Sequence, residues 1–281
     1  MWYTVDDRFM RMVIHNILMP PFIGGLLFFY FAGKELVVLL FLYIFGGIIG
    51  AIAVLLLFLT ICMLFVSPDR YYEKDSRFYR FLIDLAAAVA CFGGRLRLHI
   101  TGADLLPKNK RILYAGNHVS NYDPIVTWHA FPFAKLSYIS KASNFKIPWF
   151  GRFIRRCCFM DIDRENPRNA IVTINRAADL LKNQEVSVGV YPEGTRSKST
   201  ELLPFHNGVF KIAQKANSDI AVISLTGTEN IHKNFPWRRT DVYVDVLEII
   251  PADEIKGVKT DVIGSRVEAL LRENKRKRTN V

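Results

Sequence analysis

The segment "NHVSNYDP", residues 117–124, places a histidine five positions before an aspartate, and a proline follows the aspartate directly. The preceding run "RILYAGN" (111–117) is apolar and β-rich, which predicts a buried strand that ends in this segment. Asp123 suits the N-cap of a helix and Pro124 its first position, so we expect a helix to begin there. Strand, loop and helix in this order are the unit from which α/β sheets are built.

The same pattern extends along the rest of the chain. Six further short β-rich runs occur at residues 95–102, 135–142, 158–163, 186–192, 220–227 and 242–250. Helical patterns occur at 76–92, at 166–183, where Asn166 suits the N-cap and Pro167 the first position, and at 251–278. Strands that alternate with helices predict an α/β domain over 67–281, with one central sheet, mostly parallel or mixed, flanked by helices.

Residues 1–66 have the composition of a transmembrane helical anchor. Leu36–Val66 has no charged residue and spans about 46 Å as a helix, against a hydrocarbon core of about 30 Å. A second apolar run, Met12–Gly33, precedes Lys34 and Glu35, and we expect Pro20 and Pro21 to kink or interrupt it. The two runs predict a membrane hairpin; the alternative is one span preceded by an interfacial helix. A cleavable signal peptide fits less well, because the apolar length is too great.

The distribution of charge predicts an integral protein of the cell membrane whose larger domain faces the cytoplasm. Arg70, Lys74, Arg77 and Arg80 follow the last apolar residue, whereas the hairpin tip offers only Lys34. The formal net charge is +11. No zinc spacing or RNA-binding signature supports a nucleic-acid partner, so an anionic lipid surface or a phosphorylated substrate explains the charge better. We expect the basic end, residues 272–278, to be solvated.

The four cysteines form neither a disulfide framework nor a metal site. Cys62 and Cys91 lie in apolar stretches, and Cys157 and Cys158 are adjacent, a spacing that suits neither a mutual disulfide nor a metal. A reduced, cytoplasmic setting fits this pattern. We expect no metal and no bound cofactor.

His118 and Asp123 can form a catalytic pair only if the loop between them folds back. On a continuous helix, residues five apart point about 140° away from each other. A loop at the carboxyl end of a strand, where open α/β sheets usually place their active sites, removes this restriction. The carboxylate would then orient the imidazole, and the free ring nitrogen would act as a general base. The alternative is that Asp123 only caps the helix and His118 only satisfies backbone groups in the loop.

A second polar segment, "YPEGTRS" (191–197), follows another apolar strand. Its turn exposes backbone N–H groups, and Thr195 and Arg196 add a hydroxyl and a fork of donors, a combination that suits a phosphate. Glu193 would either orient Arg196 or bind a substrate hydroxyl. The alternative is a charged surface turn.

Together these segments resemble the glycerolipid acyltransferase family, in particular the 1-acyl-glycerol-3-phosphate (lysophosphatidic acid) acyltransferases. "NHVSNYD" is similar to the family's N-H-x4-D block, and "YPEGTRS" to its F-P-E-G-T-R-S block, with Tyr191 in place of Phe. "LPFHNGVFKIA" (203–213), "KASNFKIPWFG" (141–151) and "FMDIDR", which ends at Arg164, match three further blocks in the family's order. The chain departs from the family at Ala221 and Ser224, where a block with two prolines is usual, and this affects the identity of the substrate.

The resemblance implies transfer of a fatty acyl group from acyl-CoA or acyl-acyl carrier protein to the free hydroxyl of a lysophospholipid. His118 would be the general base and Asp123 its support. Glu193, Gly194, Thr195 and Arg196 would hold the glycerol phosphate, with Arg164 and Lys141 as further contacts.

Three other functions remain to be weighed. An acyltransferase of the same family would act on a different lysophospholipid or on glycerol phosphate. A lipid esterase would need a nucleophile elbow, and the chain has no Gly-x-Ser-x-Gly. A non-catalytic lipid-binding membrane protein would not need the intact pairs His118/Asp123 and Glu193/Arg196. A nucleotide substrate is disfavoured, because neither a P-loop nor a G-x-G-x-x-G sequence is present.

Overall fold

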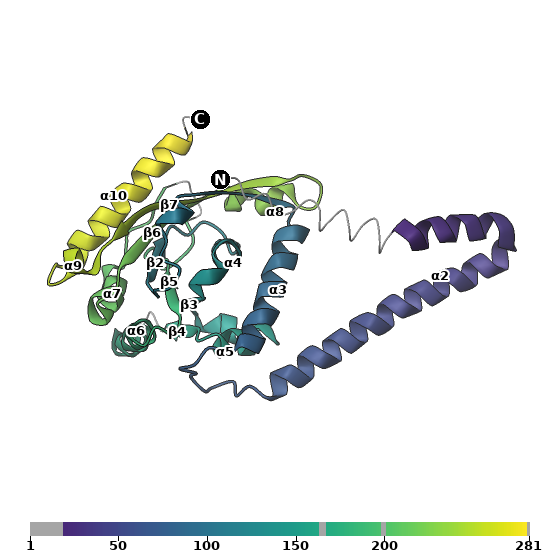
Figure 1. Ribbon diagram of the computed structural model, residues 1–281, viewed down its shortest axis with the longest axis horizontal. Helices are drawn as coiled ribbons and strands as arrows, with labels where there is room; N and C mark the ends of the chain where they lie inside the picture. The colour runs from purple at the N-terminus through teal and green to yellow at the C-terminus, as the bar shows by residue number, and fades with distance from the viewer. Residues whose placement is uncertain (1–18, 163–166, 198–200, 280–281) are drawn as a thin grey trace. The chain divides into compact units, whose positions relative to one another are not determined.

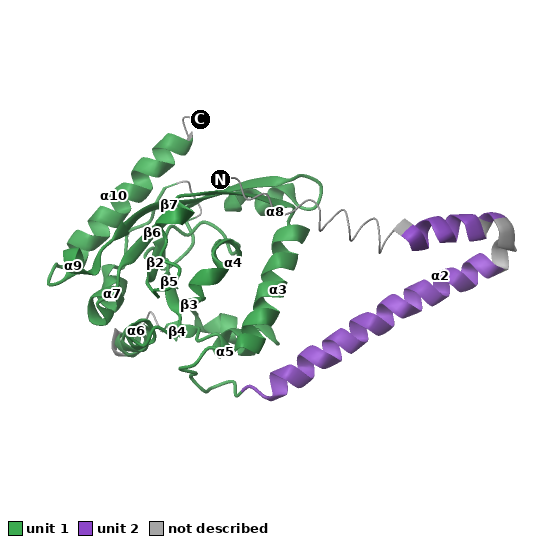
Figure 2. Cartoon of the chain, viewed as in Figure 1, with its two compact units in different colours: residues 1–3, 67–281 green, residues 4–66 purple. Residues whose placement is uncertain are grey.

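The computed structural model describes residues 19–162, 167–197 and 201–279. The chain divides into two compact units, one within residues 4–66 and one within residues 67–281 (Figure 2).

The described part of the smaller unit contains the helix α2 (Met19–Leu64). Within it, Leu36–Leu64 is the one helix of the described part of the chain that is long and apolar enough to cross a membrane, with a mean hydropathy of 2.8. Pro20 and Pro21 lie in the first turn of α2, where proline is tolerated. Because residues 12–18 lie outside the described residues, the kink and the number of spans stay predictions.

The larger unit is built on one seven-stranded sheet in the order β1-β7-β6-β2-β5-β3-β4 (Figure 1). All neighbouring strands are parallel except β6 and β7, which are antiparallel. The strands are β1 (Leu96–Thr101), β2 (Leu113–Gly116), β3 (Leu136–Lys141), β4 (Met160–Ile162), β5 (Ser187–Val190), β6 (Ile220–Thr226) and β7 (Thr240–Ile250). The predicted mixed α/β sheet flanked by helices is therefore confirmed.

Helices cover both faces of the sheet. α6, α7 and α10 lie on one side, where their apolar residues join those of β2, β5 and β6 in the main core, and α3, α4 and α5 lie on the other (Figure 1). The helices are α3 (Arg77–Gly93), α4 (Asp123–Ala130), α5 (Phe150–Arg156), α6 (Pro167–Lys182), α7 (Lys211–Ala216), α8 (Ile231–Asn234), α9 (Ala252–Ile255) and α10 (Thr260–Thr279). Pro167 begins α6 as expected, and Asn166 lies outside the described residues.

The strand register brings distant segments to one edge of the sheet. Ala115 of β2 lies beside Val190 of β5, and Gly116 of β2 lies beside Ile223 of β6. Because these strands run parallel, the segments that follow them all leave the sheet at the same edge. The loop at 117–122, the turn at 191–197 and the segment after β6 therefore meet there.

The expectation of a solvated basic end is wrong for its last described residues. Arg278 of α10 binds the carboxylate of Asp245 through Nε at 3.0 Å and through Nη2 at 2.5 Å, and its guanidinium lies over the ring of Tyr243. Asn274, one turn earlier, donates a hydrogen bond to the same carboxylate at 3.0 Å. A charged segment docks here because Asp245 is buried in the sheet and needs donors.

Candidate active site

His118 and Asp123 form a direct pair at the carboxyl end of β2. The His118 ring lies with Nδ1 2.8 Å from Oδ2 of Asp123. The Asp123 side chain is fully buried, whereas part of the His118 side chain is exposed. The loop of four residues between them folds back, which is the arrangement that the spacing required.

The carboxylate of Asp123 is held by four donors. Besides His118, the backbone N–H groups of Val119 and Ser120 each donate to Oδ2 at 2.7 Å. The hydroxyl of Thr228 donates to Oδ1 at 2.5 Å. A buried carboxylate with this many donors is fixed in place and cannot turn away from the imidazole.

The expectation that Asp123 serves as the N-cap of the helix is wrong. Asp123 is the first residue of α4, Tyr122 occupies the N-cap, and α4 has no side-chain cap hydrogen bond. The carboxylate points back over the loop because the N–H groups of Val119 and Ser120 converge on it. Asp123 therefore holds the imidazole of His118 instead of capping the helix.

The donor arrangement assigns the two nitrogens of the His118 ring. Nδ1 faces an acceptor-only carboxylate, so Nδ1 carries the proton in the neutral ring and Nε2 keeps its lone pair. The ring stacks on Tyr191, with centroids 4.3 Å apart and planes 14° apart. His118 is therefore oriented both by a hydrogen bond and by an aromatic platform.

Glu193 ties the turn at 191–197 to the histidine loop. One of its carboxylate oxygens accepts the backbone N–H of His118 at 2.7 Å and the other that of Leu203 at 2.9 Å. Glu193 is only 2% exposed, and burial raises the pKa of its carboxyl, although these N–H groups act in the opposite direction. The backbone N–H of Ser197 returns a bond to the carbonyl of His118 at 2.8 Å. His118 is thus held on both sides of its Cα by the second motif.

This bracing differs from the contacts that we expected for Glu193. Its two oxygens face backbone donors, and no ion pair joins Glu193 to Arg196 among the residues that the structure describes. A contact between Glu193 and a substrate hydroxyl stays a prediction.

Four other expected contacts of the phosphate, Gly194, Thr195, Arg196 and Lys141, lie at the same edge of the sheet. Gly194 has a positive φ of 68°, and its N–H binds the carbonyl of Tyr191 at 2.9 Å, which closes the turn. Thr195 and Arg196 follow this turn and are exposed to solvent. Lys141 is exposed at the end of β3, which runs parallel to β5. Arg164 lies outside the described residues.

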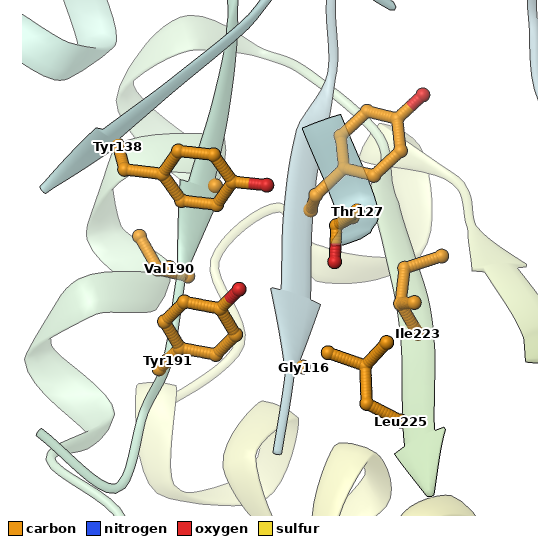
Figure 3. Close-up of a pocket in the computed structure, with 9 residues that line it drawn as sticks. Gly116, Thr127, Tyr138, Val190, Tyr191, Ile223 and Leu225 are labelled. Carbon is orange, nitrogen blue, oxygen red and sulfur yellow. The ribbon is translucent and has the colours of Figure 1, made fainter. Parts of the chain in front are cut away.

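A small cavity lies behind the Tyr191 ring, between β2, β3, β5 and α4. Figure 3 shows the hydroxyls of Tyr138, Tyr191 and Thr127 pointing into this space, with Ile223 and Leu225 opposite. The rings of Tyr138 and Tyr191 are stacked with planes 4° apart. The Tyr191 ring, on which His118 stacks, is thus itself packed against the buried ring of Tyr138.

Sequence reasoning did not identify three residues of this site. Thr228 follows β6 and reaches Asp123 from 105 positions away, with no local motif to mark it. Tyr191 was identified only as a replacement for Phe, and its stacking depends on how β5 lies beside β2. The amide of Asn117 exchanges two hydrogen bonds, each of 2.8 Å, with the backbone of Leu225. Its place directly before His118 in the motif was the one available signal.

Comparisons with known proteins give consistent findings. Residues 97–226 match the family described as Acyltransferase. A 1-acyl-sn-glycerol-3-phosphate acyltransferase of Cocos nucifera is 33% identical over 136 residues, which cover 48% of this chain and 42% of that protein. One of Haemophilus influenzae is 30% identical over 140 residues, 50% of this chain and 58% of that protein. The alpha form of Ovis aries is 26% identical over 234 residues, 72% and 79% of the two chains.

The chain thus spans about half the length of several of the curated relatives that it matches. Among solved structures, the 1-acyl-sn-glycerophosphate (LPA) acyltransferase PlsC from Thermotoga maritima superposes with a TM-score of 0.60. It is 21% identical, and the match covers 71% of this chain and 79% of that one. This likeness confirms the fold.

Proposed function

We propose that this protein, whose residues 97–226 match the family described as Acyltransferase, transfers a fatty acyl group from an acyl thioester to the free hydroxyl of 1-acyl-glycerol-3-phosphate, which gives phosphatidic acid. The family resemblance inferred from the motifs is confirmed by this match and by the names of the relatives. The acceptor, the donor and the membrane are part of the proposal. The observation that supports it most directly is the His118–Asp123 pair, held against the turn that contains Thr195 and Arg196.

The reaction uses the free nitrogen of the imidazole. Nε2 of His118 accepts the proton of the glycerol hydroxyl while the oxygen attacks the thioester carbonyl carbon. The C–S bond breaks, and the proton passes from the imidazolium to the leaving sulfur, so that a thiol and an ester are formed. Asp123 stabilises the imidazolium between these two transfers. The path requires neither an acyl-enzyme nor a metal.

The acceptor phosphate has cationic partners at the same edge of the sheet. Arg196 and Thr195 are exposed beside the loop that holds His118, and a guanidinium can bind a phosphate with two parallel hydrogen bonds. Lys141, at the end of β3, and Arg164 complete the proposed contacts. Anchoring the phosphate places the glycerol hydroxyl beside Nε2, and such positioning contributes more to the rate than proton transfer alone.

The apolar helix Leu36–Leu64 gives the protein access to its lipid acceptor. We place the larger unit on the cytoplasmic side of the cell membrane, because Arg70, Lys74 and Arg77 follow that helix. The acyl donor, acyl-CoA or acyl-acyl carrier protein, then arrives from the cytoplasm while the lysophospholipid arrives from the bilayer.

The test presents membranes that contain the protein with labelled acyl donors and a panel of lysolipids, and identifies the product. We expect labelled phosphatidic acid from the wild type. His118→Ala should lose this product while it stays folded in the membrane. Unchanged transfer by that variant would overturn the assignment of the base. Release of labelled fatty acid without any acceptor would indicate an esterase instead.

A further inference from the structure

The loop after α8 exposes an aromatic and basic surface. Its sequence is Phe-Pro-Trp-Arg-Arg, residues 235–239. Trp237 is 84% exposed and Phe235 is 54% exposed. Arg238 and Arg239 are also exposed, and their side chains form no ion pair within the described ranges. A large exposed tryptophan beside unpaired cations is unusual on a surface that only meets water.

Helix α3 exposes a second apolar surface. One face packs inward through Tyr79, Ile83 and Ala87. The opposite face is apolar too, at a spacing of three or four residues, and consists of Phe78, Phe81, Leu85, Val89 and Phe92, all exposed. A helix that is apolar on both faces needs an apolar partner on the outer one.

The loop and the end of α3 lie next to each other. The N–H of Thr240, directly after the loop, binds the carbonyl of Arg95 at 3.2 Å, and the Arg95 guanidinium reaches the carbonyl of Pro236 at 3.5 Å. The start of β1 after α3 pairs with the start of β7 after the loop. The two apolar surfaces therefore join at one corner of the larger unit. Exposed cations surround that corner, namely Lys233, Arg95, Arg97, Arg238 and Arg239.

We propose that loop 235–239 and the exposed face of α3 form one surface that docks on an anionic lipid bilayer. Tryptophan with arginine is the composition that membrane interfaces favour, and each added cation strengthens attraction to anionic head groups. Along the sequence, only residues 65–76 separate α3 from the helix Leu36–Leu64, the candidate membrane span.

Docking of this surface turns the active-site edge toward the lipid. Tyr243, near the start of β7, lies beside Thr226 at the end of β6, and Thr228 follows with its bond to Asp123. Loop 235–239 therefore leaves the sheet at the edge that holds His118. This inference concerns a membrane contact other than α2 and does not depend on the proposed reaction.

The test places the full chain in vesicles of phosphatidylcholine and phosphatidylglycerol, with and without phosphatidylcholine brominated on its acyl chains. Bromine quenches tryptophan emission at the bilayer, and the chain has four tryptophans, so the contribution of Trp237 is the difference between the wild type and Trp237→Phe. We expect stronger quenching of the wild type than of Trp237→Phe. Equal quenching of the two would overturn the proposal.

The electrostatic part is tested with Arg238→Gln/Arg239→Gln. In the anionic vesicles, the ratio of docked to undocked protein should fall by about fivefold for each arginine removed. The same ratio should also fall for the wild type in vesicles of pure phosphatidylcholine, which have no anionic head groups. The matched control is Lys256→Gln/Lys259→Gln, because these exposed lysines follow the opposite end of β7. We expect the control to retain the wild-type quenching, and an equal loss in both double variants would contradict a site at this corner.

Two further measurements separate the lipid from other occupants. A polarity-sensitive fluorophore on Leu85→Cys should shift to the blue in anionic vesicles, and an unchanged spectrum would remove α3 from the surface. Trp237→Cys should stay monomeric under oxidising conditions. A disulfide-linked dimer of this variant, together with equal bromine quenching of the wild type and Trp237→Phe, would assign the surface to a second copy of the chain and overturn the proposal.

Discussion

The hydroxyl of Thr228 donates a 2.5 Å hydrogen bond to Oδ1 of Asp123, on the oxygen opposite the one that binds His118. The segment after β6 thus fixes the carboxylate that orients the imidazole. Thr228 is fully buried, so no water replaces its hydroxyl if it is lost.

Thr228→Val should therefore lower kcat with little change in KM for the acceptor. A hydrogen bond to a charged group is worth about 1.5–3 kcal/mol, which corresponds to about a 10- to 100-fold loss of rate if all of it serves to orient Asp123. Thr228→Ser keeps the hydroxyl and should retain most of the activity. Steady-state kinetics with varied acceptor decides this, and a change in KM alone would contradict a positioning role.

Glu193→Gln tests the hydrogen bonds by which the Glu193 carboxylate joins the turn at 191–197 to the loop that holds His118. The amide offers one acceptor where the carboxylate offers two, so either the N–H of His118 or that of Leu203 faces another donor. We expect kcat/KM for the acceptor to fall by about 10- to 100-fold, because the histidine and the phosphate turn lose their common support. Glu201→Gln is the control, since this carboxylate is largely exposed. Equal effects of the two variants would contradict the role of Glu193 in holding His118.

The local part of this site could be predicted from the sequence. The pairing of His118 with Asp123 depends on six consecutive residues whose strand, loop and helix propensities agree. The seven strands were also found, because each is a compact apolar run between polar segments. The register between strands was not accessible, since all of the central strands are apolar and nothing local specifies their neighbours.

The bracing contacts could not be predicted, for a physical reason. Glu193 binds backbone N–H groups, which nearly every residue possesses, so the sequence of its partners contains no signal. Thr228 and Arg278 act through partners 105 and 33 positions away, and only the closed sheet brings them together. The prediction that Asp123 is the N-cap of the helix failed for the same reason. An aspartate before a proline suits a helix N-cap, but its carboxylate can equally well accept hydrogen bonds from the backbone of the preceding loop.

Tyr191→Phe and Tyr191→Leu separate the ring from its hydroxyl. The ring of Tyr191 stacks on that of His118, and phenylalanine preserves this contact whereas leucine does not. An aromatic pair contributes about 0.5–1.5 kcal/mol beyond its buried area, so Tyr191→Leu should lower kcat by about 2- to 10-fold. Tyr191→Phe should remain close to the wild type. If Tyr191→Phe lost as much activity as Tyr191→Leu, the hydroxyl would be the important group.

Gly194→Ala should disrupt the turn that presents Thr195 and Arg196. Gly194 has a φ of 68°, and an added Cβ would lie 2.7 Å from Cδ2 of His206. The left-handed conformation alone costs alanine about 1–2 kcal/mol. We expect a higher KM for the phosphorylated acceptor. Gly208→Ala is the matched control, because its added Cβ meets no atom within 4 Å; a similar rise in KM there would show that the effect is not specific to the turn.

Asp245→Asn should destabilise the larger unit in a pH-dependent manner. Burial on its own would raise the pKa of Asp245, but hydrogen bonds from Arg278, Thr101 and Asn274 outweigh it and hold this pKa below its usual range. A carboxyl with a lowered folded-state pKa stabilises the fold above its unfolded pKa of about 3.9, and this contribution disappears as the pH falls through the folded-state value. The loss at pH 7 should be about 2 kcal/mol, or about 4 to 8 °C in Tm for a unit of this size.

The thermal unfolding of Asp245→Asn is therefore compared with that of the wild type at pH 7 and below pH 4, in detergent. The difference in Tm should shrink at the lower pH, because the Asp245 carboxyl of the unfolded wild-type chain then takes up a proton, which stabilises the unfolded state. Asp241→Asn is the control on the same strand, since this half-exposed carboxylate pairs with His99 at the surface and should contribute little. Arg278→Gln removes the other partner, so its effect and that of Asp245→Asn should be less than additive in the double variant. If the difference in Tm between the wild type and Asp245→Asn stayed constant from pH 7 to pH 3, the packing of the Asp245 side chain, and not its charge, would stabilise the unit.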